Sequence, residues 1–206
     1  MERTPLDALC SMLRSNDRSV AEQGWELCAA LALRDRRRVA ARLLEANDWA
    51  QAARCLLPDA APQQARLLRL FGISCVVHAL PLLDSHPLLQ DYCADTLAAL
   101  RRVADERPSR ALRQRLQQRG HRESRLAARQ GPLPEACRYT LEATLALLRL
   151  PSPARAVSSA SAMSRRAHRE AAVARCADPA RADACCLRWQ QAQFFRLLLP
   201  VAKAQA

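Results

Sequence analysis

Residues 62–87 read PQQARLLRLFGISCVVHALPLLDSHP and include the most apolar run of the chain, residues 67–83. Leu70, Ser74 and Val77 follow one another at the four- and three-residue spacing of a single helix face. The run is short for a membrane span, and it contains an arginine and a histidine. The stretch therefore predicts the central, buried helix of an all-α protein.

Twelve prolines mark where further helices begin and end. Thr4-Pro5, Ser152-Pro153 and Asp178-Pro179 each place a side-chain acceptor just before a proline, which is typical of a helix N-terminus. Pro200 follows an apolar run, where a proline is expected to stop a helix. The chain has only four glycines and few β-branched runs. We predict about ten helices and no sheet, arranged as stacked antiparallel pairs, HEAT-like, or as an irregular helical bundle.

The predicted helices cover residues 5–13, 18–33, 36–46, 48–57, 62–80, 87–106, 109–119, 134–150, 153–176 and 179–199. Gly120 is expected to end the helix before it in a left-handed conformation. The first 60 residues contain short helices of mixed charge, so we predict an N-terminal subdomain over residues 1–60 and a long-helix domain over residues 61–206. The joint would lie at residues 59–62, although one continuous domain also fits the pattern.

The formal net charge is +12, and every basic residue except Lys203 is arginine. Residues 101–129 concentrate this charge, with ten arginines and three acidic residues. Such a stretch attracts an acidic protein surface or nucleic acid, or it forms a solvated helix face. It has no aromatic side chain on which bases could stack. The predicted partner-binding residues are Arg110, Arg113, Arg115, Arg119, Arg122 and the C-terminal Trp189.

Trp189 has three interpretations. In a chain with 4% aromatic residues it would contribute a large buried area to the core. It could instead be an energetic centre of a partner interface, or a ligand contact. The sequence leaves these alternatives open.

Enzymatic and metal sites are not indicated by any motif. The sequence has no glycine-rich phosphate loop, no nucleophile elbow and no HExxH pattern. Cys75 and His78 are spaced to chelate on one helical turn, but no two further ligands follow at a suitable spacing, so we expect packing residues and no metal or cofactor. Nine scattered cysteines without a CxxC motif indicate reduced thiols, and we expect a cytoplasmic protein with no membrane span.

Three stretches resemble a family of bacterial all-helical immunity proteins that accompany polymorphic toxins. They are LLRLF at residues 67–71 leading through Cys75 to HALPLL at 78–83, the alanine-rich segment 154–184, and WQQ at 189–191 followed by FRLL at 195–198. The resemblance covers about residues 67–199. It implies an all-helical protein that neutralises a cognate toxin and has no catalytic residues.

We therefore expect a non-enzymatic helical protein-interaction module, namely an immunity protein that acts by steric occlusion. Given the basic charge, the toxin surface recognised should be acidic, or recognition should be mainly apolar. The alternative hypothesis is a basic helical-repeat protein that binds nucleic acid through residues 101–129, and no small-molecule substrate is evident.

Overall fold

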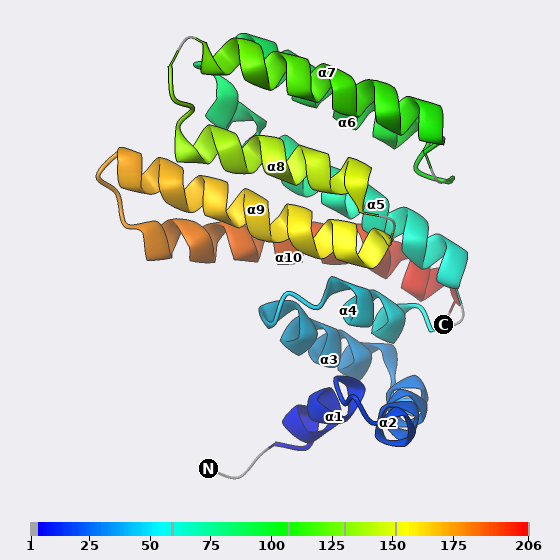
Figure 1. Cartoon of the computed structure of the whole chain (residues 1–206). Coiled ribbons are helices and arrows are strands. Elements are labelled where there is room, and N and C mark those ends of the chain that lie inside the picture. Colours follow the sequence, from blue (N-terminus) through cyan, green and yellow to red (C-terminus); the bar gives the residue numbers. More distant parts are fainter. Residues whose placement is uncertain (1–3, 59, 107, 130, 151, 206) are drawn as a thin grey trace. The chain divides into compact units, whose positions relative to one another are not determined.

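The computed structural model describes residues 4–58, 60–106, 108–129, 131–150 and 152–205 (Figure 1). Within these ranges it contains ten α-helices, one short 3-10 helix and no strand, so the predicted all-α class is confirmed. The arrangement as antiparallel pairs or as a HEAT-like stack stays a prediction. Two residues that entered the predictions, Asp59 of the joint and Arg107 of the basic stretch, lie outside the described residues.

The helices are α1 (Pro5–Leu13), α2 (Arg18–Ala30), α3 (Leu33–Glu45), α4 (Trp49–Leu56), α5 (Ala61–Ala79), the 3-10 helix η1 (Leu80–Leu83), α6 (Pro87–Arg102), α7 (Arg110–Ala128), α8 (Glu135–Arg149), α9 (Pro153–Ala174) and α10 (Pro179–Gln205).

Side-chain caps account for several of these N-termini. The Thr4 hydroxyl accepts a hydrogen bond from the Asp7 backbone N–H at 3.3 Å, and Ser109 caps α7 by accepting from Leu112 N–H at 3.2 Å. Asp178 accepts from the first free backbone N–H groups of α10. These bonds pair donors that a helix end would otherwise leave open. Of the three predicted acceptors, Thr4 and Asp178 make such bonds, whereas Ser152 stands at the N-cap of α9 without a side-chain cap hydrogen bond.

Pro200 does not end α10, so that prediction was wrong. The helix continues through Pro200 to Gln205. Phe194, Leu198 and Ala202 are buried at four-residue intervals on both sides of the proline. Burial of this continuous stripe offsets the hydrogen bond that the proline removes.

Gly120 does not end a helix either, because α7 runs from Arg110 to Ala128. A Cβ atom at Gly120 would lie 2.7 Å from Cζ of Tyr92 on α6, and closer still to the Tyr92 hydroxyl. The glycine is therefore needed for the close approach of a fully buried ring, and not for a left-handed turn.

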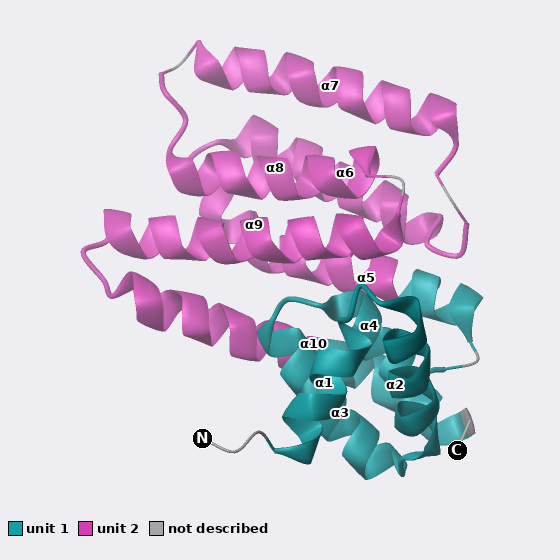
Figure 2. Ribbon diagram, turned by 60° about the horizontal axis from the view of Figure 1, so that its bottom comes forward, with its two compact units in different colours: residues 1–67, 194–206 teal, residues 68–193 magenta. Residues whose placement is uncertain are grey.

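Backbone contacts divide the chain into two compact units, shown in different colours in Figure 2. Unit 1 comprises residues 1–67 and 194–206, and unit 2 comprises residues 68–193. Compared with the predicted division at residue 60, unit 1 also takes the start of α5 and the end of α10. In unit 1, Phe194 packs against the buried Trp49, with ring centroids 5.5 Å apart.

Unit 2 has a core of aliphatic and small side chains from α5, η1 and α6 to α9. Helices α7, α8 and α9 lie side by side in Figures 1 and 2. The alanine- and serine-rich α9 buries Ala160, Ser161 and Ser164, and the Ser164 hydroxyl donates to the Cys75 carbonyl of α5 at 2.8 Å. Close packing of small side chains thus holds α9.

One segment in the described part of the chain, Ala61–Leu83, is long and apolar enough to cross a membrane. Half of its most apolar window is buried inside the protein. A core helix meets the same two criteria, so this segment is weak evidence for a span.

Candidate functional site

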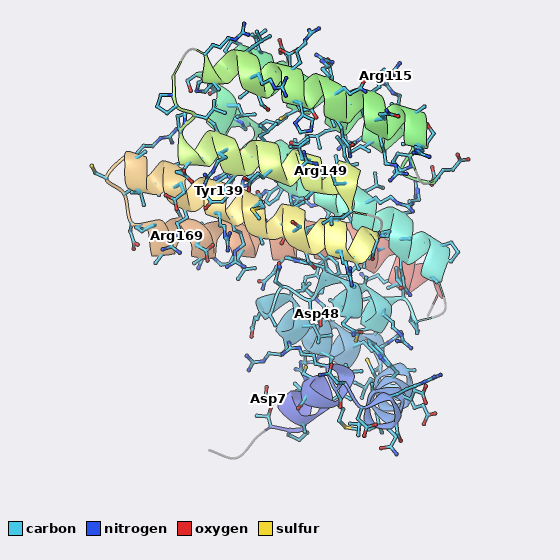
Figure 3. All side chains as sticks on the ribbon, viewed as in Figure 1. Asp7, Asp48, Arg115, Tyr139, Arg149 and Arg169 are labelled. Atoms are coloured by element: carbon cyan, nitrogen blue, oxygen red, sulfur yellow. The ribbon has the colours of Figure 1, made fainter. Side chains whose placement is uncertain are left out.

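The predicted arginines on α7 do not form one surface. Arg110, Arg115 and Arg122 are exposed, whereas Arg113 and Arg119 are half-buried. Figure 3 labels Arg115 on α7. Arg115, Arg119 and Arg122 follow one another at four- and three-residue spacing and so lie on one face of α7, whereas Arg110 and Arg113 point in other directions.

Arg113 faces a pocket of unit 2 that is lined mainly by apolar side chains. Arg69 of α5 lines the same pocket, and its guanidinium donates to the Ala104 carbonyl at 2.7 Å. The Arg113 Nε atom is buried and has no hydrogen-bond partner among the described residues. Arg113 was predicted to bind a partner together with the other arginines of α7, but its side chain is half-buried and faces this pocket.

Arg115 and Arg119 line a groove between α6 and α7, and a second groove lies between α5 and α6. Ala98 and Arg102 line both grooves, so together they form one surface centred on α6. We call it the α6 surface; it consists of Ile73, Val77, Leu80, Ala94, Asp95, Leu97, Ala98, Ala99, Arg101, Arg102, Leu112, Arg115, Leu116 and Arg119.

The α6 surface combines exposed apolar groups with arginines that have no counter-charge. Val77, which the sequence placed on one helix face with Leu70 and Ser74, is 43% exposed, and Ala94 and Ala98 are exposed on α6. Arg119 is neutralised by Asp95, with Nη1 and Oδ2 2.8 Å apart. In contrast, Arg102 and Arg115 are exposed and have no ion-pair partner among the described residues. Such a combination is typical of an interaction surface.

Arg122 lies outside both grooves. Its Nη2 atom is 3.0 Å from a carboxylate oxygen of the neighbouring Glu123, whose side chain is largely buried. The Arg122 side chain itself remains 75% exposed. It follows Arg115 by seven residues, and Arg129, the C-cap of α7, follows it by seven more, so these arginines form one outward stripe along α7 and its C-cap.

Trp189, the sixth predicted residue, is half-buried on α10 and packs on a histidine. Its ring stacks on His78 of α5, with centroids 3.8 Å apart and an interplanar angle of 11°. His168 of α9 lies on His78 as well, at 4.6 Å between centroids. All three line a pocket together with Cys186. Trp189 is thus both a packing residue and part of a pocket wall.

The pocket holds a group of metal-ligating side chains. The ligand atoms of His78, His168 and Cys186 all lie within 4.8 Å of one another. Burial lowers the pKa of His78, and burial together with the nearby His78 lowers the pKa of His168 to about 4. Both imidazoles are therefore neutral at neutral pH, with a free lone pair. Burial raises the pKa of the Cys186 thiol to about 11.

Sequence reasoning considered His78 with Cys75, and it missed His168 and Cys186. Cys75 is fully buried and is not one of the side chains clustered with His78. His168 and Cys186 lie in an alanine-rich helix and next to another cysteine, where no local pattern distinguishes them. Only the packing of α5, α9 and α10 brings these residues together.

Comparison of the chain with protein-family models, characterised proteins and solved structures finds no match. The resemblance to toxin immunity proteins therefore stays a hypothesis.

Proposed function

We propose that the chain is a non-enzymatic interaction protein that binds an acidic, amphipathic helix of a protein partner on the α6 surface. The partner would be a toxin that the chain neutralises by covering its functional surface. The observation that carries the proposal is the presence of exposed apolar groups and uncompensated arginines on the same surface.

The small side chains of α6 favour a helical partner. Ala94 and Ala98 are exposed one turn apart, so another helix can approach the α6 backbone closely. Val77 and Leu112 lie on the two sides of α6 and offer apolar contacts to that helix. A partner helix that places apolar residues here would bury surface that is otherwise exposed to water.

The charges around this apolar floor favour an acidic partner. Arg101 and Arg102 lie in the last turn of α6, and Arg115 faces the groove from α7. Carboxylates on the flank of a bound helix would meet these guanidinium groups in bidentate geometry. Charge complementarity of this kind speeds association and fixes the orientation of the partner.

Nucleic acid is the alternative, and the stripe of Arg115, Arg122 and Arg129 favours it. The stripe is about 21 Å long at the rise of an α-helix, and its charge would attract a phosphate backbone. A phosphate backbone would gain nothing from Val77, Ala94 or Ala98, and α7 offers no aromatic side chain for stacking. The apolar floor thus favours the protein partner.

Co-expression with the product of the neighbouring gene tests the proposal. The chain should co-purify with that product and restore growth to cells that produce it. The double substitution Arg102→Glu and Arg115→Glu should weaken the complex at least about 10-fold, since it reverses two charges at the surface.

A matched control is Arg34→Glu with Arg196→Glu, two exposed arginines of unit 1 that carry the same change in charge. This control should bind like the unchanged chain. Equal loss in both double variants would refute the α6 surface as the binding site. A duplex mobility shift that moderate salt abolishes, without binding to the protein, would instead support the nucleic-acid alternative.

A further inference from the structure

The pocket beside Trp189 has the composition of a zinc site. Its three candidate ligands come from three helices, His78 from α5, His168 from α9 and Cys186 from α10, and all belong to unit 2. Two imidazoles and one thiolate form a ligand set that suits zinc, whereas calcium and magnesium require several oxygen ligands. The site is separate from the α6 surface, so the inference does not depend on the proposed function.

The spacing of the ligand atoms is close to what zinc requires. Zinc–nitrogen and zinc–sulfur bonds in tetrahedral geometry separate neighbouring ligand atoms by about 3.4–3.6 Å. The three atoms here lie within 4.8 Å of one another. Side-chain rotations that move them by about 1 Å would complete the geometry, a change that χ angles absorb without moving a helix.

Unsatisfied polar atoms point to a missing partner. The Nδ1 atom of His78 and the Nε2 atom of His168 are buried and have no hydrogen-bond partner among the described residues. Leaving a buried nitrogen unpaired is costly, and two such atoms in one cluster call for an explanation. A bound cation would satisfy lone pairs that the neutral rings leave free.

The surroundings hold the ligands in place and leave room on one side. Trp189 stacks on His78 and fixes the plane of its ring. The remaining wall consists largely of small side chains, among them Ala171, Ala177 and Ala182, with Arg175 beside them. An ion can therefore enter from the surface, and a water molecule can occupy the position that the protein leaves open.

We propose that His78, His168 and Cys186 bind one Zn²⁺ ion, with water as the fourth ligand on the pocket side. On binding, the Cys186 thiol becomes a thiolate, and its proton is released to the solvent. The ion joins α5 to the consecutive helices α9 and α10, which lie far from it in the sequence, and so stabilises unit 2.

Metal titration of the full chain tests this inference. After treatment with a chelator, the protein should bind one Co²⁺ ion per chain, with visible bands of a tetrahedral site and a thiolate-to-cobalt charge-transfer band. Zn²⁺ should displace the cobalt from the loaded protein. When Zn²⁺ is added instead to the apo protein, one proton should be released for each ion bound. Zn²⁺ at about one hundred times its dissociation constant should raise the melting temperature by about 5–10 °C.

Variants locate the site. His168→Gln and Cys186→Ser should each lower the affinity more than about 100-fold, since even changes next to a ligand cost 10- to 100-fold. Only Cys186→Ser should remove the thiolate band from any cobalt that still binds. Circular dichroism establishes that each variant is folded, and Cys186→Ala serves if the serine variant is not.

The control is Cys185→Ser, the adjacent and exposed cysteine in the same pocket. It should keep the stoichiometry, the thiolate band and the thermal shift of the unchanged chain. Absence of binding to the unchanged chain, or binding that His168→Gln and Cys186→Ser leave intact, would overturn the proposal.

Discussion

Substitution of Gly120 by alanine tests how α7, the helix that carries the arginines, packs on α6. In an open helix this change would stabilise the protein by about 1 kcal/mol, because alanine has the higher helix propensity. Here the new Cβ would lie 2.7 Å from Cζ of the fully buried Tyr92 ring. Overpacking of this kind costs ~1–3 kcal/mol, and a rigid, enclosed ring favours the upper end.

The expected net effect is a loss of about 2 kcal/mol, which lowers the melting temperature by about 4–8 °C for a chain of this length. Urea unfolding followed by circular dichroism measures the free energy. In a Tyr92→Phe background the loss should be smaller, since the atom nearest the new methyl group is the tyrosine hydroxyl. That hydroxyl has no hydrogen-bond partner among the described residues, so its removal alone should cost little.

Gln118→Ala, on the exposed side of the same helix, controls for helix propensity and should leave stability within about 0.5 kcal/mol. A Gly120→Ala variant that is more stable than the unchanged chain would refute the close approach of α6 and α7.

Two further predictions concern helix packing. Phe194→Ala should lower the free energy of unfolding by ~3–5 kcal/mol, because it removes a fully buried ring from beside Trp49. Urea unfolding measures this loss. A loss below about 1 kcal/mol would contradict the assignment of the end of α10 to unit 1. Arg165 holds the pKa of Asp183 below its usual range through a bidentate pair at 2.9 and 2.8 Å. A depressed pKa gives stability that is present at neutral pH and lost as the pH falls through it, so Asp183→Asn should cost up to about 1 kcal/mol at neutral pH and nothing in strong acid. A cost that stays constant across this pH range would show that the ion pair is not its source.

The starts of several helices could be predicted because their causes are local, whereas predicted ends such as residue 106 for α6 and residue 119 for α7 differ from the structure. Thr4, Ser109 and Asp178 cap the helices that follow them, and prolines stand at several first positions. Local signals failed where packing decides. Gly120 was predicted to end a helix, but its role is to make room for Tyr92 of α6. Pro200 was predicted to stop α10, but a buried stripe that continues to Ala202 keeps the chain helical.

The candidate sites were harder to predict, because they depend on which helix faces meet. The basic stretch was visible as composition, yet its periodicity could not show that Arg113 faces a pocket while Arg115 faces α6. The metal cluster joins residues up to 108 positions apart in the sequence, from His78 to Cys186. Ligand spacings within one sequence segment therefore cannot predict a cluster whose residues lie on three different helices.

Photo-cross-linking determines whether the partner binds on the α6 surface. A photoreactive amino acid at Ala98 should cross-link the chain to the co-expressed product of the neighbouring gene. The same amino acid at Ala174, an exposed alanine at the end of α9, should not. Cross-links from position 174 with none from position 98 would show that the partner does not bind on the α6 surface.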